Sequence, residues 1–349
     1  MTDFKPIIER ELNTLRLADL ARGEKFAAIA YSKVLAKLKT IPAIYTIDDA
    51  AAAVGKGKIR AKVEEIIANG FLAAAQEARS TTNVAAYEEL LNVYGIGPKK
   101  AQTLVDAGCK GVAHLRELAM TDLSILNDKQ VVGLQYYEEI LQRIPRAEME
   151  EHERFIRRHL GPDMTAEMVG SYRRGAADSG DIDVILTMPT RIPIGERYRA
   201  FKQLALRLSE AGYLLEELAE GITKNLSIVR LPGATTARRL DLLMVSEEEF
   251  PFAVLYFTGS DKLNVAMRGH ANSLGYTMNE HGMTKIHPDV PDVPAMRSEA
   301  DIFAFLGLKY MEPTERNTDK LHLIGEAEPS KAPPTLKVKR VRVRVAPAE

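Results

Sequence analysis

Apolar residues recur at three- and four-residue steps along the first part of the chain, which is the spacing of one face of an α-helix. Leu12, Leu15 and Leu20 follow this spacing, and the pattern continues through 29–38 and 59–72. Short helical patterns broken by Gly and Pro then fill 84–150. The polar stretch at 80–83 interrupts the pattern, so we predict two all-α parts, 1–80 and 81–150.

Runs of apolar and β-branched residues replace this pattern after residue 165 and predict strands. The candidate strands are 181–186, 226–231 and 240–245, with a helix at 198–211. A further helix is expected at 262–274 and a proline-rich loop at 285–297. We therefore predict an α+β multidomain fold with an all-α front, an α/β back and a tail.

The last residues, 319–349, predict a flexible basic tail. Residues 326–336 are rich in Pro, Glu, Ser and Lys, so we expect disorder there. Lys or Arg alternates with Val in 337–345, and a strand would place Arg340, Arg342 and Arg344 on one face. A short solitary strand is unstable in water, so this segment either stays flexible, joins a sheet edge or binds a partner. We expect the flexible form, because flexible basic segments serve nuclear import or loose contact with DNA.

The composition of the chain argues against several classes of protein. Hydrophobic residues make up 46% and charged residues 27% of the chain, which argues against an overall disordered protein. No apolar run is long enough for a membrane helix and the charged start has no apolar signal core, so neither membrane insertion nor secretion is expected. The single cysteine, Cys109, excludes a disulfide framework. A net charge of −1 gives no overall preference for nucleic acid, so binding must come from local clusters.

Two glycine turns form a weak internal repeat. Gly55-Lys56-Gly57 and Gly95-Ile96-Gly97 each come directly before a helical pattern that begins with basic residues. Glycine lets the backbone approach a ligand closely, and a helix N-terminus offers free N–H groups to an anion. We predict two helix-hairpin-helix contacts with the DNA backbone, while an ordinary helix corner with a glycine cap stays open. The predicted contact residues are Lys56, Lys58, Gly95, Gly97, Lys99 and Lys100.

Carboxylates follow a Gly-Ser turn in the α/β region. Asp181 and Asp183 are two residues apart and would face the same side of a strand, and Asp241 stands in a later apolar strand. Two like charges so close favour a shared cation, and Mg²⁺ prefers oxygen ligands. An isolated Asp-x-Asp is usually only a solvated strand end. The whole pattern, opened by Gly170-Ser171, indicates a nucleotidyltransferase with two metal ions.

The motifs together resemble family X DNA polymerases, in particular their beta-type members. They are G-S-Y-R-R-G-A-A-D-S-G-D-I-D-V-I-L-T at 170–187, Y-F-T-G-S-D-K-L-N-V-A-M-R at 256–268, N-V-Y-G-I-G-P-K-K-A at 92–101, R-I-P-R-A-E-M at 143–149 and E-P-T-E-R at 312–316. The resemblance covers about 8–318. It implies a lyase-like domain with the first hairpin (1–80), a second hairpin subdomain (81–150), a nucleotidyltransferase palm (151–261) and a nucleotide-selection subdomain (262–318).

The resemblance also implies roles for single residues. Asp181 and Asp183 would hold both Mg²⁺ ions, and Asp241 would hold the catalytic ion and receive the proton of the primer 3′-hydroxyl. The residues implied for dNTP binding are Arg143, Gly170, Ser171, Arg174, Ser179, Gly180, Tyr256, Phe257, Gly259, Asp261 and Asn264. Arg239 and Arg268 would contact DNA, and carbonyls of Leu91, Val93 and Ile96 would hold Na⁺ or K⁺. A cis peptide bond is implied at Gly259–Ser260.

The front domain resembles the family's 5′-deoxyribose phosphate lyase. The segment 59–67 matches its helix, which implies Lys62 as the Schiff-base nucleophile and Tyr31 as a DNA-binding pocket residue. Ala61 stands where beta-type members carry a glutamate, and Ala27 and Ala50 fall where they carry phosphate-binding lysines. A surface lysine that only grips DNA is the alternative for Lys62.

These observations predict a template-directed polymerase that fills short gaps in base excision repair. A template-independent terminal transferase, a more distant nucleotidyltransferase and a non-catalytic DNA-binding scaffold are the alternatives. The connection Leu231–Arg238 is short, whereas template-independent members carry a long loop there, and this favours the first. We expect gapped or nicked DNA and dNTPs as ligands, DNA ligase or other repair proteins as further partners, and a monomer. We expect a nuclear protein, or one of a viral particle or cytoplasmic replication site if its source is a virus.

Overall fold

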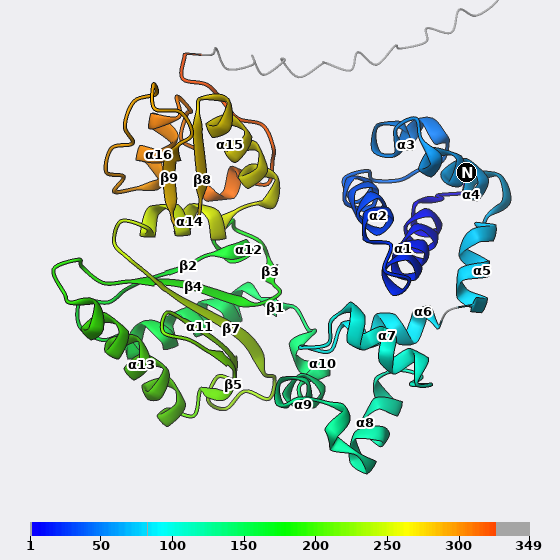
Figure 1. Ribbon diagram of the computed structural model, residues 1–349, viewed down its shortest axis with the longest axis horizontal. Coiled ribbons are helices and arrows are strands. Elements are labelled where there is room, and N and C mark those ends of the chain that lie inside the picture. Colours follow the sequence, from blue (N-terminus) through cyan, green and yellow to red (C-terminus); the bar gives the residue numbers. More distant parts are fainter. Residues whose placement is uncertain (1, 82, 326–349) are drawn as a thin grey trace, which may run out of the picture. The chain divides into compact units, whose positions relative to one another are not determined.

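The computed structural model describes residues 2–81 and 83–325, and it divides into two compact units (Figure 1). The first unit comprises the described residues up to Met168 together with Ala176–Met244. The second comprises Val169–Gly175 and the described residues from Val245 onward. The finer domain boundaries predicted at 80, 150, 261 and 318 stay a prediction. The predicted basic tail at 326–349 lies outside the described residues.

The front of the first unit is helical, as the apolar spacing predicts. In α1 (Lys5–Ala21), Ile8, Leu12 and Leu15 are buried at helical steps. This face packs against neighbouring helices, chiefly α2 and α5, around one apolar core. The further helices are α2 (Lys25–Leu38), α3 (Ile47–Val54), α4 (Lys58–Asn69), α5 (Ala73–Thr81), α6 (Val84–Leu91), α7 (Pro98–Asp106), α8 (Val112–Thr121), α9 (Asp128–Gln135) and α10 (Tyr137–Ile140), with a 3₁₀ turn at Leu123–Ile125.

The rest of the first unit is built around a five-stranded sheet. Its strands are β2 (Thr165–Met168), β4 (Ile182–Thr187), β5 (Leu214–Glu220), β6 (Lys224–Val229) and β7 (Arg238–Val245), in the order β2-β4-β7-β6-β5. The pairs β2–β4, β5–β6 and β6–β7 are antiparallel. A small ladder joins β1 (Ile144–Pro145) to β3 (Asp178–Ser179).

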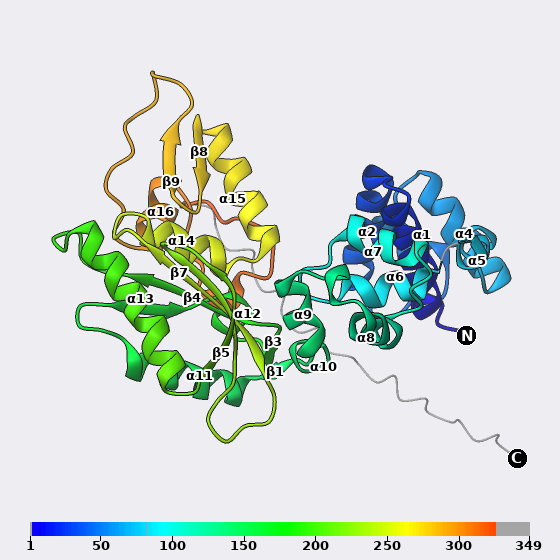
Figure 2. The same ribbon diagram turned by 60° about the horizontal axis from the view of Figure 1, so that its bottom comes forward.

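The two faces of β7 differ in chemistry. Leu240, Leu242 and Met244 are buried on one face, while Arg239 and Asp241 alternate with them and remain half-exposed. The buried face also carries Arg238, whose guanidinium binds Glu148 of α11 (Arg146–His159). Helix α11 packs beside α13 (Ile194–Glu210) along this side (Figure 2). The face with Asp241 is therefore opposite to the one that α11 covers.

The second unit builds its own core. It contains α12 (Gly170–Arg173), α14 (Phe250–Thr258), α15 (Asp261–Ser273), the hairpin β8 (Tyr276–Asn279) and β9 (Gly282–Lys285), α16 (Glu299–Phe305) and a 3₁₀ turn at Pro313–Glu315. Leu263, Met267 and Ala271 of α15 are buried at helical steps and meet Ile302 and Phe303 of α16. None of the helices in the described part of the chain combines the length and the apolar character that crossing a bilayer requires.

Candidate functional site

The three predicted aspartates lie on neighbouring strands of the sheet. Asp183 is within β4, Asp181 directly precedes it, and Asp241 is in the adjacent strand β7. Arg239, which shares its face of β7 with Asp241, pairs with Asp181 at 2.5 Å. Asp183 is two residues from Asp181, so strand alternation gives it the same orientation. These observations assign the three carboxylates to one face of the sheet.

Burial and charge act together on Asp241. Burial raises the pKa of its carboxyl, the neighbouring Asp181 raises it further, and Arg239 and Lys224 oppose this. The Arg239 guanidinium also lies 5.8 Å from the ring centroid of Tyr94, on the side of the second hairpin. Arg239 was predicted to contact DNA. The structure adds a contact that the sequence did not indicate, since Arg239 neutralises one of the predicted metal ligands.

The donor set suits a hard cation, because carboxylate oxygens are the ligands that Mg²⁺ prefers. Within residues 2–81 and 83–325, however, no group of three or more His, Cys, Asp or Glu side chains is gathered closely enough to hold a metal ion. Asp181 is engaged with Arg239 instead. The metal assignment of Asp181, Asp183 and Asp241 therefore stays a prediction.

Arg143, predicted to bind a triphosphate, is held beside Gly180. Its Nε and Nη2 donate to the Asp178 carboxylate at 2.9 and 2.7 Å, and the pairing of Ile144 with Ser179 fixes the adjacent backbone. A Cβ added at Gly180 would lie 3.0 Å from Nη1 of Arg143. Glycine is thus the residue that leaves room for this guanidinium.

Five of the predicted dNTP-binding residues line one pocket of about 340 Å³ in the second unit. They are Arg174, Tyr256, Phe257, Gly259 and Asp261. Ser260, Lys262 and Asn317 also line it and were not predicted as site residues. Asn317 accepts a hydrogen bond from Nε of Arg174 at 3.0 Å. Its position directly after the motif E-P-T-E-R is the sequence feature that could have identified it as a site residue. The predicted cis peptide bond at Gly259–Ser260 is present.

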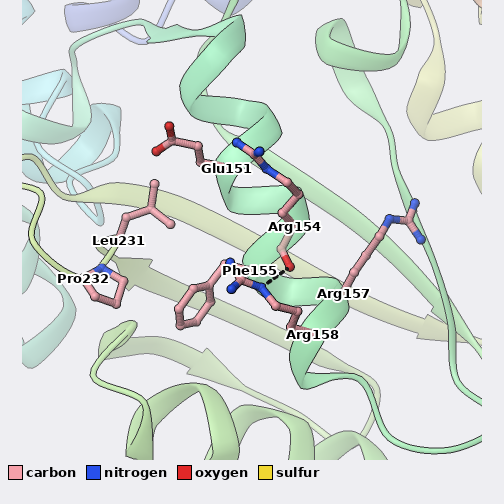
Figure 3. A pocket seen from close by; sticks show the side chains of 7 residues that line it. All are labelled: Glu151, Arg154, Phe155, Arg157, Arg158, Leu231 and Pro232. Atoms are coloured by element: carbon pink, nitrogen blue, oxygen red, sulfur yellow. Dashed lines mark hydrogen bonds between the residues drawn. The ribbon is translucent and has the colours of Figure 1, made fainter.

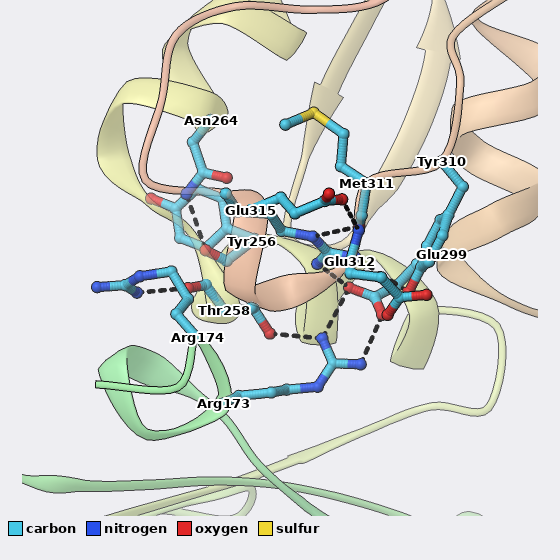
Figure 4. A network of polar contacts seen from close by, with 11 residues as sticks. Arg173, Arg174, Tyr256, Thr258, Asn264, Glu299, Tyr310, Met311, Glu312 and Glu315 are labelled. Carbon is cyan, nitrogen blue, oxygen red and sulfur yellow. Dashed lines mark hydrogen bonds and ion pairs between the residues drawn. The ribbon is translucent and has the colours of Figure 1, made fainter. Parts of the chain in front are cut away.

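A buried ionic network supports this pocket (Figure 4). Arg316 is fully buried and pairs with Glu299 at 2.5 Å, and Glu299 also pairs with Arg173 at 2.7 Å. The backbone carbonyl of Arg316 accepts hydrogen bonds from both the N–H and the hydroxyl of Ser260. Arg174, next to Arg173, donates to the carbonyl of Thr258. The network therefore connects α12, the end of α14 and the 3₁₀ turn.

Asn264 and Arg268 line a second hollow of the same unit, together with Tyr256, Met278 and Asn279. Asn264 donates its side-chain amide to the carbonyl of Tyr256 at 2.8 Å. Both residues project from α15, four positions apart, so they share a helix face. The remaining predicted residues, Gly170 and Ser171, begin α12.

Both glycine turns occur where they were predicted. Gly55 and Gly95 have φ angles of 65° and 83°, and α4 and α7 begin directly after Gly57 and Gly97. Lys56, Lys58 and Lys99 are exposed, whereas the ammonium of Lys100 binds the carbonyl of Ile125. Near the predicted cation site formed by Leu91, Val93 and Ile96, the carbonyl of Val93 accepts the N–H of Ile96.

The predicted lyase residues lie in separate helices of the front domain. Lys62 is half-buried on α4. Tyr31 is buried on α2, where burial raises the pKa of its hydroxyl, Asp19 raises it further, and Arg22 opposes this. Ala50 is completely buried in the core, so this position offers no surface for a phosphate.

Comparisons with known proteins identify the class to which this fold and site belong. Models of the DNA polymerase beta palm, the DNA polymerase beta thumb and the fingers domain of DNA polymerase lambda match residues 143–247, 253–317 and 88–141. The chain belongs to the X family of DNA polymerases.

Two relatives are proteins named DNA polymerase lambda. The one from Rattus norvegicus is 32% identical over 336 residues, which is 90% of this chain and 57% of the relative. The one from Arabidopsis thaliana is 29% identical over 321 residues, which is 85% of this chain and 59% of the relative. The chain thus spans less than two thirds of the length of these relatives.

Proposed function

We propose that the protein is a template-directed DNA polymerase that fills short gaps during DNA repair. The observation that carries the proposal is Asp241, a half-buried carboxylate beside Asp181 on the face of β7 opposite to α11. Such a charge is costly without a counter-charge. A pair of Mg²⁺ ions, when bound, would neutralise charge on the triphosphate and lower the pKa of the primer 3′-hydroxyl.

The aspartates take different roles in this proposal. Asp181 and Asp183 would hold both ions, and Asp241 would hold the catalytic one. A carboxylate oxygen of Asp241 also receives the proton of the primer 3′-hydroxyl. The raised pKa of Asp241 suits this role, because a stronger base accepts a proton more readily.

We assign the proposed dNTP contacts to residues of each unit in turn. In the first unit, Arg143, Ser179 and Gly180 bind phosphate oxygens. In the second unit, Gly170, Ser171 and Arg174 bind phosphate, and the pocket walls select the sugar and base through Tyr256, Phe257, Gly259, Asp261 and Asn264. Arg268 contacts the template strand. The hairpin lysines grip the DNA backbone, with Na⁺ or K⁺ at the carbonyls of Leu91, Val93 and Ile96.

The short turn after β6 separates this function from template-independent addition. Only Arg230–Ala237 join β6 to β7, which leaves no long loop to take the place of a template. Family membership and the three carboxylates disfavour a non-catalytic scaffold. Lyase activity at Lys62 is a second proposal, supported by the match of 59–67 to the family's lyase helix.

Extension of a one-nucleotide-gapped duplex tests the polymerase proposal. The wild type should insert the templated nucleotide, and Asp183→Ala should abolish insertion. Asp163→Asn is the matched control, because Asp163 is an exposed carboxylate with a positive φ that asparagine tolerates. Equal extension without a template, or by Asp183→Ala, would overturn the proposal.

Borohydride trapping on a 5′-abasic phosphate tests the lyase proposal separately. The wild type should be trapped covalently and Lys62→Ala should not, while both fill the gap. Trapping that survives in Lys62→Ala would assign the chemistry to another amine, and no trapping in the wild type would leave the front domain as a DNA clamp.

A further inference from the structure

A hollow of about 740 Å³ lies along α11, the helix that covers the sheet face opposite to Asp241. Its lining combines arginines with apolar groups from two elements: α11 contributes Glu151, Arg154, Phe155, Arg157 and Arg158, and the turn after β6 contributes Leu231 and Pro232. None of these residues belongs to the polymerase site proposed above.

Two of the arginines lack a salt bridge within the described part of the chain, although the Arg158 guanidinium lies 5.9 Å from the centroid of the Phe155 ring. Arg154 and Arg158 are exposed, and each donates its Nε at 3.2 Å to a carbonyl of its own helix. Their terminal nitrogens form no salt bridge among the described residues, and the neighbouring carboxylates Glu150 and Glu153 pair with Arg146 and Arg157. Arg157 differs, because it pairs with Glu153 at 2.8 Å and extends away from Phe155 (Figure 3). The nearby Glu150 is engaged with Arg146 at 3.6 Å.

The aromatic ring in the apolar part of the hollow already has stacking partners. The Phe155 ring points toward Leu231 and Pro232 (Figure 3). It is stacked against Tyr213 with centroids 4.6 Å apart and against His159 with centroids 4.5 Å apart. Single-stranded nucleic acid is usually held by bases that stack on free aromatic faces. Here Tyr213 and His159 already stack on the ring, and the Arg158 guanidinium lies 5.9 Å from its centroid, so the ring offers little free face to a base.

We propose that this hollow binds an acidic peptide segment of a partner protein. A guanidinium fork matches a carboxylate with two parallel hydrogen bonds, so Arg154 and Arg158 each accommodate one Asp or Glu. Phe155, Leu231 and Pro232 then seat an apolar side chain between the acidic ones. A DNA backbone would pair with the arginines as well, but a deoxyribose fills this seat less completely than an aliphatic side chain does, so the shape of the hollow favours the peptide.

Fluorescence anisotropy with a labelled short peptide of alternating Glu and Leu residues tests the proposal on the full chain. The double variant Arg154→Gln/Arg158→Gln should weaken binding at least about tenfold, because it removes both charged hydrogen-bond donors of the peptide carboxylates. The control Arg191→Gln/Arg199→Gln removes the same charge from exposed positions outside the hollow and should bind as the wild type does. A peptide with Gln in place of Glu should not bind.

The readouts separate the possible results. Unchanged gap filling and an unchanged melting temperature in the double variant, together with the loss of peptide binding, support a docking site independent of the polymerase function. Equal peptide affinity in the double variant and the wild type would overturn the proposal. Loss of duplex DNA affinity in the double variant, with no peptide binding by the wild type, would also overturn it and assign the arginines to nucleic acid.

Discussion

The guanidinium of Arg239 lies beside Asp181, where the proposed mechanism would have a metal ion. Burial raises the pKa of Asp241 and repulsion from Asp181 adds to it, while the positive charge of Arg239 offsets part of this effect. The same residue therefore stabilises the acidic face, and under the proposed chemistry a metal ion held by Asp181 would compete with this contact. The charges of Arg239, Asp181 and Asp241 thus determine the electrostatics of this site.

Gly180 provides a residue-scale prediction. We expect Gly180→Ala to raise the KM for dNTP about tenfold, because the new Cβ would lie 3.0 Å from Nη1 of Arg143 and displace this guanidinium. Steady-state gap filling measures KM and kcat. Gly195→Ala is the control, since a Cβ there meets nothing within 4 Å. An unchanged KM in Gly180→Ala would contradict the expectation that the new Cβ displaces the guanidinium from the nucleotide.

His152 provides a prediction about pH. Its Nδ1 lies 2.7 Å from the Tyr213 hydroxyl, and burial lowers the pKa of the imidazole from 6.5 to about 4, against the opposing effect of Glu148. Between these values the unfolded chain binds a proton that the folded chain does not. The free energy of unfolding should therefore fall by about 1.4 kcal/mol per unit as pH drops from 6.5 to 4.

Chemical denaturation of the wild type and of His152→Gln across this pH range checks the expectation. The stability difference between them should shrink as pH falls, because glutamine does not titrate. His287→Gln removes an exposed histidine and should leave the pH dependence unchanged. A constant difference between the wild type and His152→Gln would contradict the assignment.

At the scale of elements, helices were predictable wherever a buried face repeats, and strands wherever apolar runs are long. Strands β4, β6 and β7 occur within a few residues of 181–186, 226–231 and 240–245. Strand β5 was missed because Leu214–Glu220 is composed of good helix formers, and its pairing with β6 is irregular. The hairpin of β8 and β9 was missed because each strand has only four residues and is stabilised by packing against α15.

The ionic network of the second unit gives a prediction at this scale. Glu299→Gln should lower the free energy of unfolding by about 3 kcal/mol, because the fully buried Arg316 loses its counter-charge and Arg173 loses a partner. Thermal and chemical denaturation measure the loss, with Asp289→Asn as a control at an exposed carboxylate.

The KM of Glu299→Gln for dNTP should rise as well, since the network fixes Ser260 and Thr258 at the pocket. Wild-type stability in Glu299→Gln would mean that the network contributes little.

At the scale of the whole molecule, the order of the family motifs along the chain predicted more of the candidate site residues than apolar periodicity and residue spacing did. The Asp-x-Asp spacing placed two carboxylates on one face, and the lone charge in an apolar strand singled out Asp241. Contacts between distant segments were not accessible, because nothing in the spacing joins Arg239 to Asp181 or Asn317 to Arg174. Such pairs depend on tertiary packing, which local periodicity does not encode.

The distribution of charge gives a prediction for the molecule as a whole. The net charge is only −1, yet Lys56, Lys58 and Lys99 are exposed beside the two glycine turns. Each phosphate contact releases counterions and contributes about 0.9 to the slope of log affinity against log salt. Affinity for gapped DNA should therefore fall steeply with salt, and Lys58→Ala/Lys99→Ala should reduce the slope by about 1.8 if each lysine contacts one phosphate. Anisotropy titrations over a salt series measure it, with Lys202→Ala as a control because Lys202 pairs with Glu220. A slope that is flat, or one that the double variant does not change, would show that the glycine turns do not hold DNA through these lysines.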